Sequence, residues 1–225
     1  LNPRNRHREL PRGTLSVGQA WASIVVAAVL FVAASWAINP LCGWLSPVAL
    51  AWVMTYSVMK RFTYWPQIFL GLAFNWGAFV GWSAIHQGIA WPAVLLYLGG
   101  IAWTLAYDTI YAHQDKEDDL LIGLKSTAVK FGAATPRWLA LFFALALLLI
   151  WLAARLAGAG WIFTIAIAAA ALHALWQLRQ LDIAASSTHP ESRKQALTFV
   201  FVGGGYAGVE ALAELEDMAR DALRY

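Results

Sequence analysis

The sequence has 225 residues, of which 60% are hydrophobic and 13% are charged. Soluble domains carry about 25% charged and about 45–50% apolar residues, so this composition excludes an ordinary soluble enzyme and predicts a polytopic protein of the lipid bilayer. The single cysteine excludes an internal disulfide framework and a cysteine-rich zinc site. The formal net charge of +3 does not indicate nucleic acid as a partner, because membrane proteins use Lys and Arg to set their topology.

Windows of about 20 apolar residues predict seven membrane-spanning helices. The predicted spans are residues 17–38, 44–59, 66–86, 91–112, 138–157, 159–178 and 196–214. Ser16, Asn39-Pro40 and Pro66 stand where helices are expected to begin or end. Several Trp residues near these ends fit an interfacial aromatic belt, namely Trp44, Trp65, Trp82, Trp91, Trp138 and Trp161. The expected fold class is therefore all-α, a transmembrane helix bundle.

The connections between these spans differ in charge. When they are assigned alternately to two sides, most of the 16 Lys and Arg residues fall on one side: Arg4, Arg6, Arg8, Arg12, Lys60, Arg61, Lys116, Lys125, Lys130, Arg137, Arg179, Arg193 and Lys194. The positive-inside rule predicts that this side faces the cytoplasm.

Acidic residues gather at the end of the fourth predicted span. Of the 13 Asp and Glu residues, five lie within residues 108–119: Asp108, Asp115, Glu117, Asp118 and Asp119. If the helix continues past Ala112, then Asp108, Asp115 and Asp119 share one helical face. Like charges so close together repel unless a cation lies between them, and Mg²⁺ held by one or two carboxylates plus substrate phosphates would meet that need. The pattern predicts a site for a Mg²⁺-bridged phosphate or diphosphate.

A plainer interpretation exists for each of these features. The run from Asp115 to Asp119 also fits a solvated charged loop, and Lys60-Arg61 also fits a topology signal at a helix end. Asp108 favours a functional site, because it follows an apolar stretch inside a span and carboxylates within membranes usually serve function. His113 fits either a ligand or a hydrogen-bonded neighbour of the site.

The segment Tyr107-Asp-Thr-Ile-Tyr-Ala-His-Gln-Asp-Lys-Glu-Asp-Asp119, followed by Ile122-Gly-Leu-Lys-Ser-Thr127, resembles the second Asp-rich motif of the UbiA prenyltransferase family. Tyr56-Ser-Val-Met-Lys-Arg-Phe-Thr-Tyr-Trp-Pro-Gln67 resembles a loop of its 4-hydroxybenzoate polyprenyltransferase members, and Arg8-Glu-Leu-Pro-Arg-Gly13 resembles the segment after the first Asp-rich motif. The resemblance extends over about residues 4–195.

The resemblance implies a nine-helix membrane bundle, of which about seven spans lie here, and Mg²⁺ as cofactor. It also implies transfer of a polyprenyl group from polyprenyl diphosphate to the ring of 4-hydroxybenzoate in ubiquinone biosynthesis. Asp115 and Asp119 would bind the metal, with support from Asp108, and Lys60 would contact the diphosphate. Arg61, Tyr56, Lys116 and Arg8 would bind substrate, Arg61 through the acceptor carboxylate. The expected location is a bacterial inner membrane, ahead of the mitochondrial inner membrane.

Two parts of the sequence depart from the family pattern. The first Asp-rich motif is expected just before Arg4 and is not present in these 225 residues, so we expect negligible turnover from this chain alone. This departure keeps a non-catalytic pseudoenzyme as an alternative, alongside a small-molecule transporter. Residues 1–195 form the predicted prenyltransferase domain. Residues 196–225 contain Gly203-x-Gly205-x-x-Gly208 and resemble a nucleotide-binding segment of type II NADH dehydrogenases, which also fits a glycine-bearing last helix.

Overall fold

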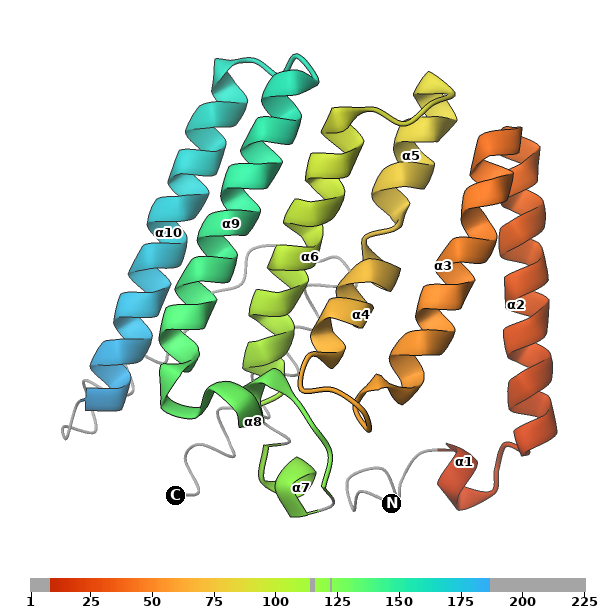
Figure 1. Ribbon diagram of the computed structural model, residues 1–225, viewed down its shortest axis with the longest axis horizontal. Helices are drawn as coiled ribbons and strands as arrows, with labels where there is room; N and C mark the ends of the chain where they lie inside the picture. The colour runs from red at the N-terminus through yellow and green to blue at the C-terminus, as the bar shows by residue number, and fades with distance from the viewer. Residues whose placement is uncertain (1–8, 114–115, 122, 187–225) are drawn as a thin grey trace. The chain divides into compact units, whose positions relative to one another are not determined.

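The computed structural model describes residues 9–113, 116–121 and 123–186, and every regular element within them is helical (Figure 1). The elements are α1 (Glu9–Arg12), α2 (Val17–Ile38), α3 (Pro40–Met59), α4 (Pro66–Phe74), α5 (Gly77–His86), α6 (Trp91–Tyr111), α7 (Lys116–Leu121), α8 (Thr127–Phe131), the 3₁₀ turn η2 (Gly132–Ala134), α9 (Thr135–Leu156) and α10 (Trp161–Ser186). The prediction of an all-α membrane bundle is confirmed. The chain divides into two units, residues 1–165 and 166–225, and the site described below lies in the first.

Five helical segments among the described residues are long and apolar enough to cross a membrane: Val17–Ile38, Pro40–Met59, Pro66–His86, Trp91–Tyr111 and Thr127–Leu156. The first has a mean hydropathy of 2.2, although only 6% of its apolar window is buried inside the protein. Such an apolar surface is stable against lipid and not against water. The first five predicted spans are therefore confirmed as apolar helices, whereas the span predicted at 196–214 lies outside the described residues.

The helix ends show why the boundaries fall where they do. The Ser16 hydroxyl accepts a hydrogen bond from the Gln19 amide, and the Gln19 side chain accepts one from the Ser16 amide, which is a complete capping box for α2. The Asn39 side chain accepts from the Cys42 amide, so α3 begins at Pro40. The prediction placed the start of this helix at residue 44 and was wrong, because Asn39 ends one helix and also caps the next.

The third span is broken between α4 and α5. The Asn75 side-chain amide donates to the Gly71 carbonyl at 2.9 Å and to the Thr104 hydroxyl of α6 at 2.9 Å. The Trp76 indole donates to the Leu45 carbonyl of α3 at 2.9 Å. Asn75 and Trp76 thus hold the broken segment against the neighbouring helices. Their side chains also donate to backbone carbonyls that lipid would leave unpaired.

α6 is the central helix of the first unit. It packs against α9 on one side and against α4 and α5 on the other, while α3 packs against α4, α5 and α2 (Figure 1). Glycines allow the close approach: a Cβ on Gly71 would meet Ile101 at 3.1 Å, and a Cβ on Gly99 would meet Ile150 at 3.0 Å. Small residues at such contacts are typical of membrane helices, where packing replaces the hydrophobic effect.

Candidate active site

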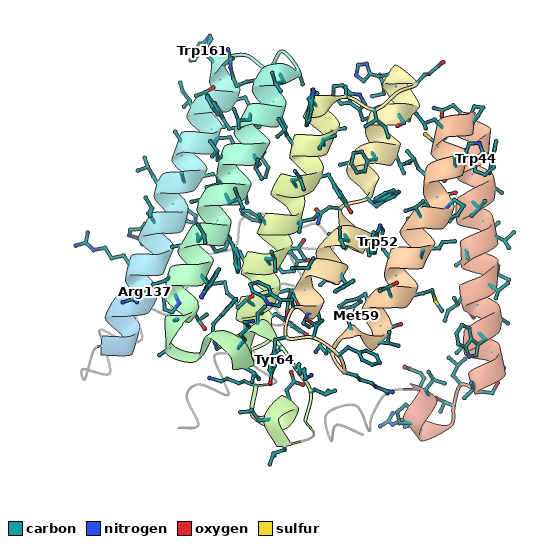
Figure 2. All side chains as sticks on the ribbon, in the orientation of Figure 1. Trp44, Trp52, Met59, Tyr64, Arg137 and Trp161 are labelled. Carbon is teal, nitrogen blue, oxygen red and sulfur yellow. The ribbon has the colours of Figure 1, made fainter. Side chains whose placement is uncertain are left out.

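Three helices meet at the candidate site, where α3 and α6 end and α4 begins. After Met59 the chain turns through Lys60 and Arg61, with the Thr63 amide donating to the Met59 carbonyl at 3.0 Å. Pro66 then occupies the first position of α4, where its missing amide hydrogen costs nothing. Figure 2 shows Met59 and Tyr64 at this end of the helices, opposite Trp44 and Trp161. The predicted grouping of Lys60 with the later basic loops agrees with this arrangement.

A carboxylate lies at the centre of this junction. Asp108 occupies the last turn of α6, and Lys60 and Gln67 both face it. Tyr56 lies one turn before Lys60 on α3 and faces Asp108, together with Tyr107. The structure therefore brings together Tyr56, Lys60 and Asp108, three residues that the sequence analysis placed in one site.

The Gln67 side chain is the largest fully buried side chain in the described part of the protein, with 1% of its surface exposed. Its amide nitrogen is placed to donate to the Asp108 carboxylate, whereas its amide oxygen has no hydrogen-bond partner among the described residues. Leaving such groups unsatisfied in a buried position costs about 1–3 kcal/mol each, so a buried carboxamide is normally hydrogen-bonded. Gln67 thus contributes a donor and an acceptor to the junction, beside the Asp108 carboxylate.

Two loops are joined over the junction by lysines. The Lys125 amide donates to the Lys60 carbonyl at 3.0 Å, and the Lys125 ammonium donates to the Phe62 carbonyl at 3.2 Å. The same ammonium lies 5.5 Å from the centre of the Tyr64 ring, and that of Lys130 lies 5.1 Å from the centre of the Trp65 ring. These cation–π contacts hold two positive charges close to the carboxylate-bearing segments.

Aromatic side chains form one wall of the junction. The rings of Trp65 and Phe131 meet edge to face at 5.4 Å, and those of Phe131 and Trp138 stack at 4.8 Å. Phe142 completes the group, which belongs to the hydrophobic core around Leu105. Trp65 and Trp138 are partly buried and pack against this core from the helix ends, and their place in an interfacial belt stays a prediction.

The acidic segment after α6 does not continue that helix. α6 ends at Tyr111, and Ala112 and His113 form a turn before the separate short helix α7. A ring nitrogen of His113 lies 2.8 Å from the Thr109 carbonyl, where it binds the last turn of α6. The predicted single helical face carrying Asp108, Asp115 and Asp119 is therefore wrong. The apolar pattern ends at the membrane boundary, and the helix ends with it.

The remaining predicted residues have different positions. Asp119 lies on α7 with 2% of its surface exposed, and its carbonyl accepts from the Leu124 amide at 2.8 Å. Lys116 begins α7 and is half-buried, whereas Arg61 is exposed. Asp115 and Arg8 lie outside the described residues.

Among the described residues, no three His, Cys, Asp or Glu side chains lie close enough together to hold a metal ion. Asp108 and Asp119 nevertheless supply hard oxygen ligands, each on a segment joined to the basic loops. Mg²⁺ is usually held by one or two carboxylates and by substrate phosphates, not by a cage made only of protein. The donor set fits a Mg²⁺ ion that binds together with a diphosphate.

The sequence analysis missed Gln67 and Lys125 as members of the site. The signal for Gln67 was available, because it is a lone polar residue directly after Pro66 at the start of an apolar span. Lys125 was counted only for topology, since its contact with Phe62 joins residues 63 positions apart.

The fold and site define an integral membrane protein with a half-buried carboxylate, two lysines over aromatic rings and an aromatic wall at one end of its helices. The model of the UbiA prenyltransferase family matches residues 1–207, and the chain belongs to this family. The solved apo structure of a UbiA homolog from Aeropyrum pernix K1 superposes with a TM-score of 0.69 at 26% identity, covering 85% of this chain and 72% of that one.

Curated relatives are more similar in sequence. The mitochondrial 4-hydroxybenzoate polyprenyltransferase of Arabidopsis thaliana is 48% identical over 136 residues, which are 60% of this chain and 33% of the relative. The human protein of the same name is 48% identical over 141 residues, 62% of this chain and 38% of the relative. The chain thus spans about a third of the length of the curated relatives that it matches.

Proposed function

We propose that the chain is part of an integral membrane prenyltransferase that transfers a polyprenyl group from its diphosphate to the ring of 4-hydroxybenzoate, in ubiquinone biosynthesis. The observation that carries this proposal is the 48% identity to proteins named 4-hydroxybenzoate polyprenyltransferase. The half-buried Asp108 facing Lys60 and Gln67 supplies a matching polar site within an apolar bundle. No observation favours a transporter or a pseudoenzyme.

The carboxylates would hold Mg²⁺ against the diphosphate of the donor. Asp119 and Asp115 take this role, and Asp108 supports it from α6. Mg²⁺ bound there would neutralise the charge that builds up on the departing diphosphate. Lys60 would bind a diphosphate oxygen through a charge-assisted hydrogen bond, and Lys116 and Arg8 would add positive charge from the neighbouring segments.

The acceptor would lie between the basic turn and the aromatic wall. Arg61 would bind the carboxylate of 4-hydroxybenzoate, and Tyr56 would border the space beside Asp108. Loss of diphosphate leaves an allylic cation, which the electron-rich ring captures at a carbon atom. That carbon then loses its proton to a basic oxygen, such as one of the released diphosphate, and the aromatic ring is restored. Aromatic faces such as those of Trp65 and Phe131 would stabilise the cation and exclude water that would otherwise consume it.

The membrane would be one in which ubiquinone is made. A bacterial inner membrane, with the basic loops toward the cytoplasm, was the expectation from sequence, but the relatives carry mitochondrial names. Those names favour a mitochondrial inner membrane, with the basic loops on the matrix side. A tagged chain can be inserted into either membrane and treated with protease from one side. Protection of the loop at Lys125 then shows whether this loop faces the cytoplasm or matrix, as proposed, or the opposite side.

Ligand binding tests the proposal without requiring turnover. The chain in lipid nanodiscs is expected to bind a non-hydrolysable farnesyl thiodiphosphate weakly, and only when Mg²⁺ is present. Asp119→Ala should abolish this binding, and Lys60→Met should weaken it by about 10- to 100-fold, since a charge-assisted hydrogen bond contributes about 1.5–3 kcal/mol. Arg155→Met is the matched control, because Arg155 lies at the far end of α9 and donates to the Ala159 carbonyl.

Turnover is the second test. Membranes that contain the 225-residue chain alone are expected to show negligible transfer to radiolabelled 4-hydroxybenzoate. The same chain extended by the sequence encoded upstream of Leu1 is expected to form prenylated product if that sequence carries an Asn-Asp-x-x-Asp motif. Absence of both Mg²⁺-dependent binding and product would refute the proposed function.

A further inference from the structure

The Gln67 side chain is fully buried but has an unpaired polar atom. It is 1% exposed, and although its amide nitrogen can donate to Asp108, its amide oxygen makes no hydrogen bond to the described residues. Other fully buried polar side chains nearby are satisfied within the protein: Thr104 binds Asn75, and Thr109 binds Thr127 at 2.7 Å. Gln67 therefore differs from its buried neighbours, and its partners are expected to come from outside the chain or from a small movement within the site.

The neighbouring carboxylate determines which way the amide points. Gln67 lies beside Asp108, which also faces the Lys60 ammonium. An ionised carboxylate accepts hydrogen bonds and donates none, so the amide nitrogen of Gln67 is the atom that suits Asp108. The amide oxygen is then turned toward the remaining space and requires a donor. Neither Lys60 nor Tyr56 supplies it, because no described residue donates a hydrogen bond to this oxygen.

We propose that Gln67 determines specificity for the acceptor, with its side-chain oxygen accepting a hydrogen bond from a hydroxyl group on the aromatic ring. Its amide nitrogen donates to Asp108 and thereby holds the oxygen in place. This role rests on the proposed function, because it assigns the hydroxyl of that acceptor. A site built to bind a hydroxyl rejects the analogue without one, since the buried acceptor is then left unpaired.

Three para-substituted benzoates separate hydrogen-bond donation from size. The groups of 4-hydroxybenzoate and 4-aminobenzoate donate, whereas the fluorine of 4-fluorobenzoate is of similar size and cannot donate. In nanodiscs containing the full chain, calorimetric titration should give the two donors an affinity at least about 10-fold higher than that of 4-fluorobenzoate, the effect of one buried hydrogen bond. This ratio of affinities is the quantity to follow in each variant.

Gln67→Met is the critical variant. Methionine has a similar length and shape but neither polar atom, so it removes both groups without leaving one of them unpaired. In this variant the ratio of the affinity for the two donors to that for 4-fluorobenzoate should fall to within about 3-fold of unity. The variant should bind 4-fluorobenzoate at least as tightly as the unchanged protein does. Ser46→Ala is the matched control: Ser46 is fully buried on α3 but satisfied by the Gly43 carbonyl at 2.8 Å, so this variant should keep the full ratio.

The possible failures have different meanings. If the unchanged chain binds none of the three benzoates, the acceptor class of the proposed function is wrong, and this inference falls with it. If the unchanged chain prefers the donors and Gln67→Met keeps that preference, only the role of Gln67 is overturned. The role of Gln67 is also overturned if the unchanged chain binds all three benzoates with equal affinity, which would indicate a water molecule as the donor. It is overturned as well if Ser46→Ala loses the preference for the donors.

Discussion

Gly100→Ala should show how closely α4 is fitted to α6. A Cβ at position 100 would overlap the side-chain amide of Asn75, which is held by Gly71 and Thr104. Moving that amide breaks two hydrogen bonds at about 1 kcal/mol each, and overpacking adds about 1–3 kcal/mol. Alanine regains about 1 kcal/mol through its higher helix propensity. The net expected loss is about 2–4 kcal/mol of unfolding free energy.

Gly81→Ala provides the control on the same broken span. A Cβ at Gly81 of α5 would meet no atom within 4 Å, so this variant keeps the gain in helix propensity and has no clash. Thermal unfolding in detergent micelles, followed by circular dichroism, measures both variants. For a chain of this size about 1 kcal/mol shifts the midpoint by about 2–4 °C, so Gly100→Ala should unfold about 5–15 °C lower and Gly81→Ala at or above the original midpoint.

Equal midpoints for the two alanine variants would refute the packing argument. That result would mean that Asn75 does not hold the break in the third span against α6. A double variant with Thr104→Val sharpens the test: once Asn75 has lost its partner on α6, Gly100→Ala should cost less than it does alone, because the two changes share one interaction.

Three further predictions concern the loops, the end of α6 and the metal. Lys125→Met removes the contact with the Phe62 carbonyl and with the Tyr64 ring, so trypsin should cleave after Arg61 several-fold faster; an unchanged rate would contradict the joining of the two loops. Thr109→Val leaves the Thr127 hydroxyl buried and unpaired, at a cost of about 1–3 kcal/mol, and adding Thr127→Val should recover part of the lost thermal midpoint; simple additivity would argue against the pair. Chelation of Mg²⁺ should abolish binding of the thiodiphosphate but leave 4-hydroxybenzoate affinity within about 3-fold, as titration with and without chelator would show; equal loss of both would argue against separate sites for the two substrates.

The membrane spans were predictable because lipid requires long apolar helices whatever their neighbours are. Asp108 was predictable for the related reason that a carboxylate in such a helix is costly and is kept for function. Its proximity to Tyr56 and Lys60 followed from the family resemblance and is present in the structure. These features depend on local composition or on motifs, both of which are visible in one sequence.

Features that depend on distant partners were not predictable. The 21 residues from Pro66 to His86 are mostly apolar and read as one helix, and the break at Asn75 requires Thr104, which lies 29 positions away. The extension of α6 to Asp119 failed because helical periodicity says nothing about where a helix stops. Here it stops in a turn at His113, where the segment leaves the apolar region.

The break in the third span also explains how a polar site forms beside lipid. Gly100, Thr104 and Asp108 follow one another at intervals of four residues and share one face of α6. Asn75, at the end of α4, meets the first two, and Gln67, at its start, meets the third. A short helix fixed to α6 at one end presents its other end to Asp108. The break frees α4 from the direction that α5 takes, so that the contacts of α4 with α6 and α3 can set the site.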